Sequence, residues 1–323
     1  MRLRGLDIIL TYECTGRCAH CCYRAGPGQG QTMTAEEVER CLAAVAEHPI
    51  DWILLFGGEP FLCHDLLRAS VALAAAVAGV LVFTNGYWAV DTGSALERLA
   101  ELRGAGLDHI LFSVDAFHQE HVPLGRIATG IEAARALGFG RIEVDNRWLG
   151  APDEDNAYNQ RTREIIEHLA EMCDLQDVQI YQGSSRMVGR AADELRPHAA
   201  VQPGSLDQCV VPGWLGADIR CPSTVEIHPG GWVNLCAGIA LGNIRHRSLD
   251  LILDEYDPHT HPIVGPLVRE GPLGLLALAE RHGYVSEASY VDACHLCYQV
   301  RRFLHPYYPD ELAPAHVYVG DPL

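Results

Sequence analysis

The predicted order of strands and helices is the feature of this sequence that most constrains its fold. Short apolar runs, typical of buried parallel strands, alternate with longer amphipathic stretches over about the first 190 residues. Strands are expected at residues 6–11, 52–56, 79–84, 109–114, 141–145 and 177–181. Helices are expected at residues 34–48, 65–78, 94–102, 127–137 and 159–171, the first of them beginning with a capping box. Repeated strand–helix units of this kind predict an α/β fold with a parallel sheet and helices outside it.

The length of this alternation decides between a complete barrel and a partial one. A TIM barrel of eight strand–helix units needs about 250 residues, whereas the pattern here stops near residue 190, after six units. We therefore predict a partial (β/α)6 TIM barrel. Residues 196–203 read as a linker, and beyond Cys209 the sequence is rich in cysteine, glycine and proline and predicts only short helices. The chain is accordingly divided into a barrel domain, residues 1–200, and a small C-terminal domain with a tail, residues 201–323.

Charge and cysteine content narrow the class of protein. A formal net charge of −18 disfavours nucleic-acid binding, which needs clustered Lys and Arg to neutralise phosphates. No apolar run has the length of a membrane span, and the first four residues lead into a strand rather than a secretory signal. We therefore expect a cytoplasmic protein with no membrane contact. In that compartment, twelve cysteines indicate metal binding rather than a disulfide framework.

Three cysteines lie close together directly after the first predicted strand. Cys14, Cys18 and Cys21 have the spacing C-x3-C-x2-C. Three thiolates in one loop can hold three irons of a [4Fe–4S] cluster and leave the fourth iron open, and an open metal position is where chemistry occurs. The alternatives are a zinc knuckle, for which Cys22 would have to join, or three buried thiols. In the cluster interpretation we expect Cys22 not to bind metal.

This loop resembles the signature of the radical S-adenosylmethionine (SAM) superfamily. The family usually has an aromatic residue before the third cysteine, where this chain has His20. The resemblance implies that Cys14, Cys18 and Cys21 hold the catalytic cluster and that SAM binds the open iron through its amino and carboxylate groups. It also implies that SAM is cleaved there to methionine and a 5′-deoxyadenosyl radical.

A glycine-rich turn after the second strand fits the same family. The turn is Gly57-Gly58-Glu59-Pro60, and the resemblance implies that it lines the methionine amino group of SAM. Glycine lets the backbone approach a ligand closely, and the Glu59 carboxylate can accept a hydrogen bond from an ammonium group. Taken alone, the same four residues would fit a plain turn.

Polar residues also follow the third, fourth and fifth strands. By resemblance they contact the ribose and carboxylate of SAM; they are Thr84, Asn85, Ser113, Asp115 and Arg147. A strand-end turn or a helix cap is the alternative for Ser113 and Asp115. For Arg147 the alternative is a surface ion pair.

Two further segments are expected near the same face of the barrel. His118 and His121 follow the fourth strand and could hold a metal or move a proton, although polar loop residues would look the same. Gly189 and Arg190 follow the sixth strand, and they resemble a stretch found in family members that carry a second cluster.

A second group of cysteines lies in the C-terminal part. Cys221 and Cys236 flank a glycine in the pattern C-x9-G-x4-C, and Cys294 and Cys297 form a C-x2-C pair. This spacing resembles the first half of the SPASM extension of the family, and more closely its short form, called twitch, which carries one auxiliary cluster. By resemblance these four cysteines hold an auxiliary [4Fe–4S] cluster, and Cys209 is a fifth candidate that could replace one of them. The alternative is a structural zinc site with four cysteine ligands.

Together these features predict a radical SAM enzyme with two [4Fe–4S] clusters and SAM as cofactors. The expected reaction is abstraction of a hydrogen atom from the substrate and a net two-electron oxidation, such as dehydrogenation or ring or crosslink formation. Redox-neutral epimerisation is the nearest alternative, with Cys209 as its candidate hydrogen donor. A non-catalytic iron–sulfur or zinc protein is the alternative from another class.

Substrate and reductant are predicted only as classes. The first strand begins within a few residues of Met1, so no leader-peptide-binding module is expected before it, which favours a small-molecule substrate. A peptide-modifying maturase is the alternative. A reductant such as a flavodoxin or ferredoxin is the expected protein partner.

Overall fold

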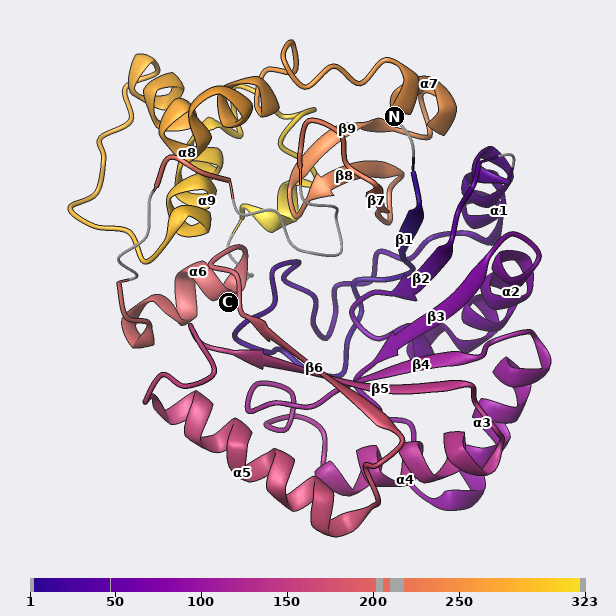
Figure 1. Cartoon of the computed structure of the whole chain (residues 1–323). Coiled ribbons are helices and arrows are strands. Elements are labelled where there is room, and N and C mark those ends of the chain that lie inside the picture. Colours follow the sequence, from indigo (N-terminus) through magenta and orange to yellow (C-terminus); the bar gives the residue numbers. More distant parts are fainter. Residues whose placement is uncertain (1–2, 47, 202–205, 210–217, 320–323) are drawn as a thin grey trace.

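One sheet runs through the whole molecule. The computed structural model describes residues 3–46, 48–201, 206–209 and 218–319. In this part of the chain the strand order is β6-β5-β4-β3-β2-β1-β7-β8-β9 (Figure 1). The strands are β1 (Gly5–Ile9), β2 (Trp52–Phe56), β3 (Gly79–Thr84), β4 (His109–Ser113), β5 (Arg141–Trp148), β6 (Val178–Ser184), β7 (Thr224–Ile227), β8 (Trp232–Cys236) and β9 (Ile239–Asn243). Because β6 and β9 stand at opposite ends of this order, the sheet is open, which confirms the predicted partial barrel.

Helices α1 to α5 alternate with the parallel strands and cover the outer side of the curved sheet, whereas α7, α8 and α9 follow the last strand (Figure 1). Side-chain caps fix the starts of some of them, for example the capping box of Thr34 and Glu37 on α1. No helix in the described ranges is long and apolar enough to cross a membrane. The helices are α1 (Ala35–Val45), η1 (Pro60–Cys63), α2 (His64–Ala75), α3 (Thr92–Gly104), α4 (Leu124–Ala136), α5 (Ala157–Met172), α6 (Arg190–Glu194), η2 (Arg196–His198), α7 (Leu249–Asp254), α8 (Val264–Arg281), α9 (Ala293–Leu304) and η4 (Ala315–Val317).

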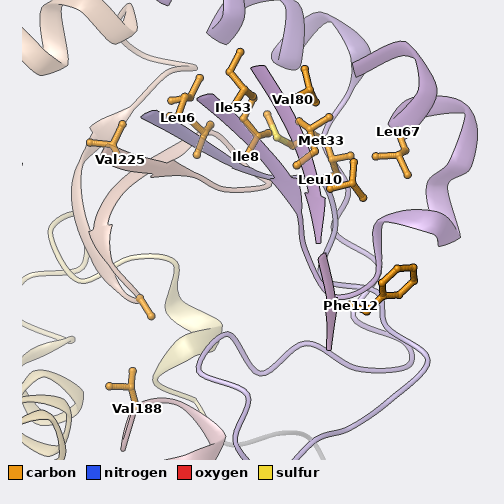
Figure 2. Packing of buried hydrophobic residues seen from close by; sticks show 14 of the residues in the cluster. Leu6, Ile8, Leu10, Met33, Ile53, Leu67, Val80, Phe112, Val188 and Val225 are labelled. Carbon is orange, nitrogen blue, oxygen red and sulfur yellow. The ribbon is translucent and has the colours of Figure 1, made fainter. Parts of the chain in front are cut away.

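Alternation along the strands separates the two faces of the sheet. Ile53 and Leu55 in β2 and Ile110 in β4 are completely buried, whereas their sequence neighbours in the same strands are partly exposed. Figure 2 shows Leu6 and Val80 gathered with Ile53 on the side of the strands that the helices cover. Burying one such side chain contributes about 1.5–3 kcal/mol. The apolar core therefore lies between sheet and helices, and the polar residues collect at the strand ends.

The sheet continues across the predicted domain boundary near residue 200. β7 pairs in parallel with β1, with Glu226 opposite Asp7, and β8 and β9 follow as antiparallel strands. The division into residues 1–200 and 201–323 stays a prediction. Helix α8 is longer than expected, but it is kinked at Glu270 and Gly271, where the backbone leaves helical geometry just before Pro272. The kink fits the sequence, because Gly271 has a φ of +59° and proline cannot donate a helix hydrogen bond.

Candidate active site and thiol cage

The three signature cysteines lie in the loop between β1 and α1. Cys14 and Cys18 are buried, and Cys21 is half-buried. Burial, with smaller contributions from the nearby Glu59 and Cys21, raises the pKa of Cys14 to about 12. Burial and the two neighbouring thiols also raise the pKa of Cys18 well above its usual range. A bound metal cation removes this cost by stabilising all three thiolates at once, so the donor set fits three irons of a cluster.

A buried arginine after β6 holds this loop in place. Arg190 is 1% exposed and donates from Nη1 and Nη2 to the carbonyl groups of Cys18 and Ala25, both at 3.0 Å. Its backbone N–H donates to the carbonyl of Cys21, also at 3.0 Å. Gly189 has a φ of +64°, and a Cβ there would lie 2.3 Å from a backbone oxygen of the loop. The pair Gly189–Arg190 therefore supports the N-terminal cysteine loop.

A second arginine ties the loop to the C-terminal part of the chain. Arg24 is 2% exposed, and its Nε donates to the carbonyl of Val317 at 3.1 Å. Its Nη2 donates to the carbonyl of Gly189 at 3.1 Å and to the hydroxyl of Tyr298 at 3.2 Å, and it pairs with Asp193. The residues around η4 consequently pack against the loop as an ordered wrap.

The turn at residues 57–60 packs against the same loop. The N–H of Gly58 donates to the carbonyl of Thr11 at 2.6 Å, and the N–H of Glu59 donates to that of Glu13 at 2.9 Å. A Cβ on Gly57 would lie 2.4 Å from the Thr11 oxygen, and one on Gly58 would lie 2.3 Å from the Glu13 oxygen. The close approach of the loop backbone therefore requires both glycines, whatever ligand they also line.

The carboxylate of Glu59 joins this turn to the end of β3. It is completely buried and accepts from the N–H groups of Phe61 at 3.1 Å and Asn85 at 2.7 Å, and from the hydroxyl of Thr84 at 2.8 Å. Burial outweighs these hydrogen bonds and raises the pKa of Glu59 to about 7. The side-chain Nδ2 of Asn85 lies 3.7 Å from Cys14 Sγ. The turn, the end of β3 and the cysteine loop thus meet at one place.

Asp115, just after β4, anchors a tight turn beside the loop. Its buried carboxylate accepts from the N–H groups of Phe117 and His118 at 3.0 Å and from His118 Nδ1 at 2.9 Å. Although burial alone would raise it, the charge and hydrogen bonds of His118 lower the pKa of Asp115 to about 2. The ring of His118 lies 4.7 Å from that of His20. Burial and the charge of His118 lower the pKa of His20 to about 3, so His20 is a neutral ring beside the cysteines.

The two histidines after β4 do not converge on one point. The donor atoms of His118, His20 and Cys18 all lie within 4.8 Å of one another. His121 instead lies beside Gly16, where a Cβ would be 3.0 Å from its ring. A metal held jointly by His118 and His121 is therefore not supported.

Arg147, in β5, forms a bidentate ion pair with Asp145. Its Nε donates to Oδ2 at 2.6 Å and its Nη2 to Oδ1 at 3.0 Å, and the two side chains are only 20% and 8% exposed. Arg147 is thus in a largely buried ion pair rather than a surface one. Ser113 is buried and pairs in register with Asp145. Contact of SAM with Ser113, with Arg147 or with the buried Pro60 stays a prediction.

Four cysteines of the second group border a common cavity. We call them the thiol cage; they are Cys209, Cys236, Cys294 and Cys297. Cys221 is exposed and is not among the residues lining the cavity. Within the described residues the cavity is thus bordered by Cys209 and not by Cys221. Which four cysteines bind a metal stays a prediction.

The width of the thiol cage bears on the kind of metal it could hold. A tetrahedral zinc ion with Zn–S bonds of 2.3 Å holds its sulfur atoms about 3.8 Å apart. No three of the cage sulfurs, all of which belong to described residues, lie within 4.8 Å of one another. In this structure the cage sulfurs are thus not gathered around a single-ion centre, and the choice between a zinc ion and a cluster stays a prediction.

Two arginines that sequence reasoning missed border the thiol cage. Arg186 donates from Nη1 to Cys236 Sγ at 3.3 Å. Arg301 is 1% exposed, contacts Cys297 and donates from Nη1 to the carbonyl of Ala237 at 2.8 Å. The i, i+4 spacing of Cys297 and Arg301 on one helix was the available signal for Arg301. Nothing in the loop after β6 distinguishes Arg186 from a surface arginine.

Comparison with known proteins agrees with this site. Residues 8–156 match the family model of the radical SAM superfamily. Residues 8–156 are therefore a radical SAM superfamily domain.

Curated relatives and solved structures resemble different extents of the chain. A GTP 3′,8-cyclase of Acidothermus cellulolyticus is 34% identical over 161 residues, which cover 44% of this chain and 42% of the relative. A GTP 3′,8-cyclase of Tolumonas auensis is 31% identical over 156 residues, which cover 45% of this chain and 44% of the relative. The chain thus spans less than half the length of these curated relatives. The solved structure "Native anSMEcpe with bound AdoMet and Cp18Cys peptide" covers 94% of this chain and 96% of its own, with a TM-score of 0.51 at 14% identity, and so shares the fold.

Proposed function

We propose that this protein is a radical SAM enzyme that abstracts a hydrogen atom from a small-molecule substrate. The net reaction is a two-electron oxidation of that substrate. The observation that carries the proposal is a loop with three neighbouring thiols, Cys14, Cys18 and Cys21, after the first of the parallel strands, at the end of the sheet where barrel enzymes place their sites. Cys22, the next residue, is engaged elsewhere, because its Sγ accepts from Arg186 at 3.7 Å. Three cysteines thus bind three irons of a four-iron cluster and leave the fourth iron open for SAM.

The residues around the trio suit a bound cluster and SAM. When bound, a [4Fe–4S] cluster with SAM supplies the reductive cleavage of SAM to methionine and a 5′-deoxyadenosyl radical. Cys14, Cys18 and Cys21 would hold that cluster, Arg190 fixes their loop, and His20 offers a neutral ring face beside them. A flavodoxin- or ferredoxin-type protein would deliver the electron.

The turn at residues 57–60 and the ends of β3 to β5 would hold SAM itself. Glu59 already binds three donors of its own chain, so its added role is one further hydrogen bond from the methionine amino group. Arg147 would share its guanidinium between Asp145 and the methionine carboxylate. Thr84, Ser113 and Asp115 would shape the ribose side of the pocket.

The thiol cage supports oxidation over epimerisation. Cys209 lines the cage with Cys236, Cys294 and Cys297, so we assign it as the fourth ligand of an auxiliary [4Fe–4S] cluster in place of Cys221. A thiol bound to iron is not available as a hydrogen donor, which removes the residue that epimerisation would have used. A twitch-like cluster module is therefore part of the proposal.

The substrate is proposed as a small molecule of unspecified structure. The curated relatives are named for a reaction of GTP, itself a small molecule, but they match under half of this chain. We therefore do not transfer GTP to this protein. A peptide is the alternative substrate, and product analysis separates the two.

Anaerobic purification and SAM turnover test the proposal. Two four-iron clusters predict about eight iron atoms per chain, and dithionite with SAM should release 5′-deoxyadenosine. The Cys14→Ala/Cys18→Ala/Cys21→Ala variant should release none, whereas Cys41→Ala, which changes a buried cysteine of α1, should behave as wild type. Colourless, zinc-bound protein or product formation by the triple variant would refute the assignment.

The mass of the product distinguishes the reaction outcomes. Oxidation leaves a product lighter by two hydrogens. Epimerisation in deuterated water instead leaves one solvent deuterium and an unchanged oxidation state, and that result would overturn the oxidase proposal while keeping the enzyme class.

A further inference from the structure

The segment that follows β6 lies between the two cysteine sites and contacts both. Arg190 and Gly189 support the N-terminal loop, and Met187 packs in one cluster with Cys18. Val188 and Arg186, in the same segment, line the cavity of the thiol cage. Residues 186–190 therefore form the physical link between the two sites.

Arg186 contacts thiols on both sides of this link. Its Nη1 lies 3.3 Å from Cys236 Sγ in the cage, and its Nη2 lies 3.7 Å from the Sγ of Cys22, next to the ligand Cys21. Burial opposes its charge, but Cys236, Cys22, Tyr23 and Glu226 raise the pKa of Arg186 well above its usual range. Since a guanidinium is always protonated in proteins, the cage wall carries a permanent positive charge.

Arg301 places a second positive charge at the cage from helix α9. It contacts Cys297 directly, and its guanidinium is also used by the carbonyl of Ala237 and the hydroxyl of Tyr318, both at 2.8 Å. Its burial, at 1% exposure, keeps water from screening the charge. Arg301 thus has a structural task in addition to its contact with a thiol.

The charge of a cluster in the cage makes these contacts consequential. Four thiolates around an oxidised four-iron core give a net charge of about −2, and each added electron makes it more negative. Hydrogen bonds to the sulfurs and nearby positive charges lower the free energy of the reduced form. A cluster without these hydrogen bonds and charges would have a lower reduction potential and would accept an electron less readily.

We propose that Arg186 and Arg301 raise the reduction potential of the cluster in the thiol cage and so make it an electron acceptor. The inference rests on the second cluster of the proposed function, and it adds which residues set the reduction potential of that cluster. Arg186 donates to a cage thiol and to the neighbouring Cys22 thiol, and Arg301 contacts Cys297, so both positive charges lie at the sulfur atoms of the cage.

The test is a redox titration of the auxiliary cluster alone, followed by electron paramagnetic resonance. The Cys14→Ala/Cys18→Ala/Cys21→Ala background removes the catalytic cluster, so the remaining signal belongs to the cage. In that background Arg186→Gln should lower the midpoint potential by at least 59 mV, which is a tenfold change in the ratio of reduced to oxidised cluster for one electron. Arg186→Lys, which keeps the charge but loses the planar fork, should give a smaller shift.

Matched variants separate tuning from structural damage. Arg302→Gln removes a partly exposed arginine next in sequence to Arg301 and paired with Asp193, and it should leave the potential unchanged. Iron content near four per chain shows that the cage is intact in each variant. If Arg186→Gln does not retain iron, the titration of Arg301→Gln decides, since that variant removes the second positive charge and the contact with Cys297.

Each outcome points to one of the two proposals. An unchanged potential in fully loaded Arg186→Gln, or in loaded Arg301→Gln where the first variant fails, overturns the tuning role while the two-cluster enzyme stands. A triple-cysteine background that binds no iron instead shows that the auxiliary cluster is absent, and the proposed function loses its second cluster together with this inference.

Discussion

The two cysteine sites of this molecule are built in opposite ways. The N-terminal trio comes from a single loop, between Cys14 and Cys21, which three separate elements then support. The thiol cage is assembled from the segment at Cys209, the end of β8 at Cys236 and the helix α9 with Cys294 and Cys297. A site encoded in one loop can be identified from spacing alone, whereas a site assembled from distant segments depends on which segments the fold brings together.

The largest expected difference between the sites concerns the choice of cage ligand. Cys209→Ala should lower the iron content from about eight to about four per chain, because the cage loses one of its four thiols. Cys221→Ala, the matched control, should keep the full iron content because Cys221 is exposed and outside the cage. Iron analysis and electron paramagnetic resonance of anaerobically purified protein check both variants. The reverse pattern would restore the assignment made from the sequence spacing.

The support of the catalytic loop is the next largest effect. Arg190→Ala leaves the carbonyls of Cys18 and Ala25 buried without these donors, which should cost about 4 kcal/mol of unfolding free energy. Denaturant unfolding of the cluster-free protein measures this loss, and iron analysis should show the N-terminal cluster depleted. Arg302→Ala should change stability little, since its ion pair is partly exposed. An Arg190→Ala protein that is stable and keeps its full iron content would contradict the support of the loop by Arg190.

A single added methyl group should distinguish a close contact from a flexible loop. Gly58→Ala places a Cβ 2.3 Å from the carbonyl oxygen of Glu13, so the turn and the cysteine loop must separate. We expect a loss of about 3 kcal/mol in the unfolding free energy and a marked loss of 5′-deoxyadenosine production. Gly30→Ala, in the same loop but with open space around the glycine, should be nearly neutral in both measurements. Equal effects of the two changes would show that the contact at Gly58 is not tight.

The smallest effect is a pH dependence from the turn beside the loop. The pKa of Asp115 is lowered to about 2 in the folded protein, below its ordinary value of about 3.9. The carboxylate therefore stabilises the fold at any pH above about 4, and this stabilisation of about 2 kcal/mol is lost as the pH falls toward 2. Denaturant unfolding of cluster-free protein between pH 6 and pH 2 should show this loss in wild type and not in Asp115→Asn. An identical pH profile for the two proteins would exclude the Asp115–His118 contact as its source.

The sequence predicted the sheet well because its signals are local. All six strands of the barrel were found within a few residues, and helix α1 begins at its capping box, since apolar runs and caps act over a single element. The pairing of β7 with β1 was not predicted, because two short strands far apart in sequence carry no mark of being neighbours.

The site was predicted to different degrees for the same physical reason. The loop cysteines, the glycine turn and Asn85 were identified by a resemblance in local sequence, and the structure brings them together. The arginines that support them were missed, because a buried Arg190 or Arg24 has the same letter as a surface arginine and only tertiary packing distinguishes the two. The prediction for Arg147 missed its partner Asp145, although the i, i+2 spacing on one strand face was readable.

The parallel pairing of Gly5 with Thr224 has a consequence for biosynthesis. Until the ribosome has released the chain past residue 227, β1 has a free edge on the side away from β2, and the loop that follows it lacks the contacts made by Tyr298 and Val317. Long-range pairing of this kind gives a high contact order and a slow final folding step. During synthesis the edge of β1 is unpaired and the cysteine loop lacks its C-terminal contacts. We therefore expect the N-terminal site to take up its iron after translation is complete.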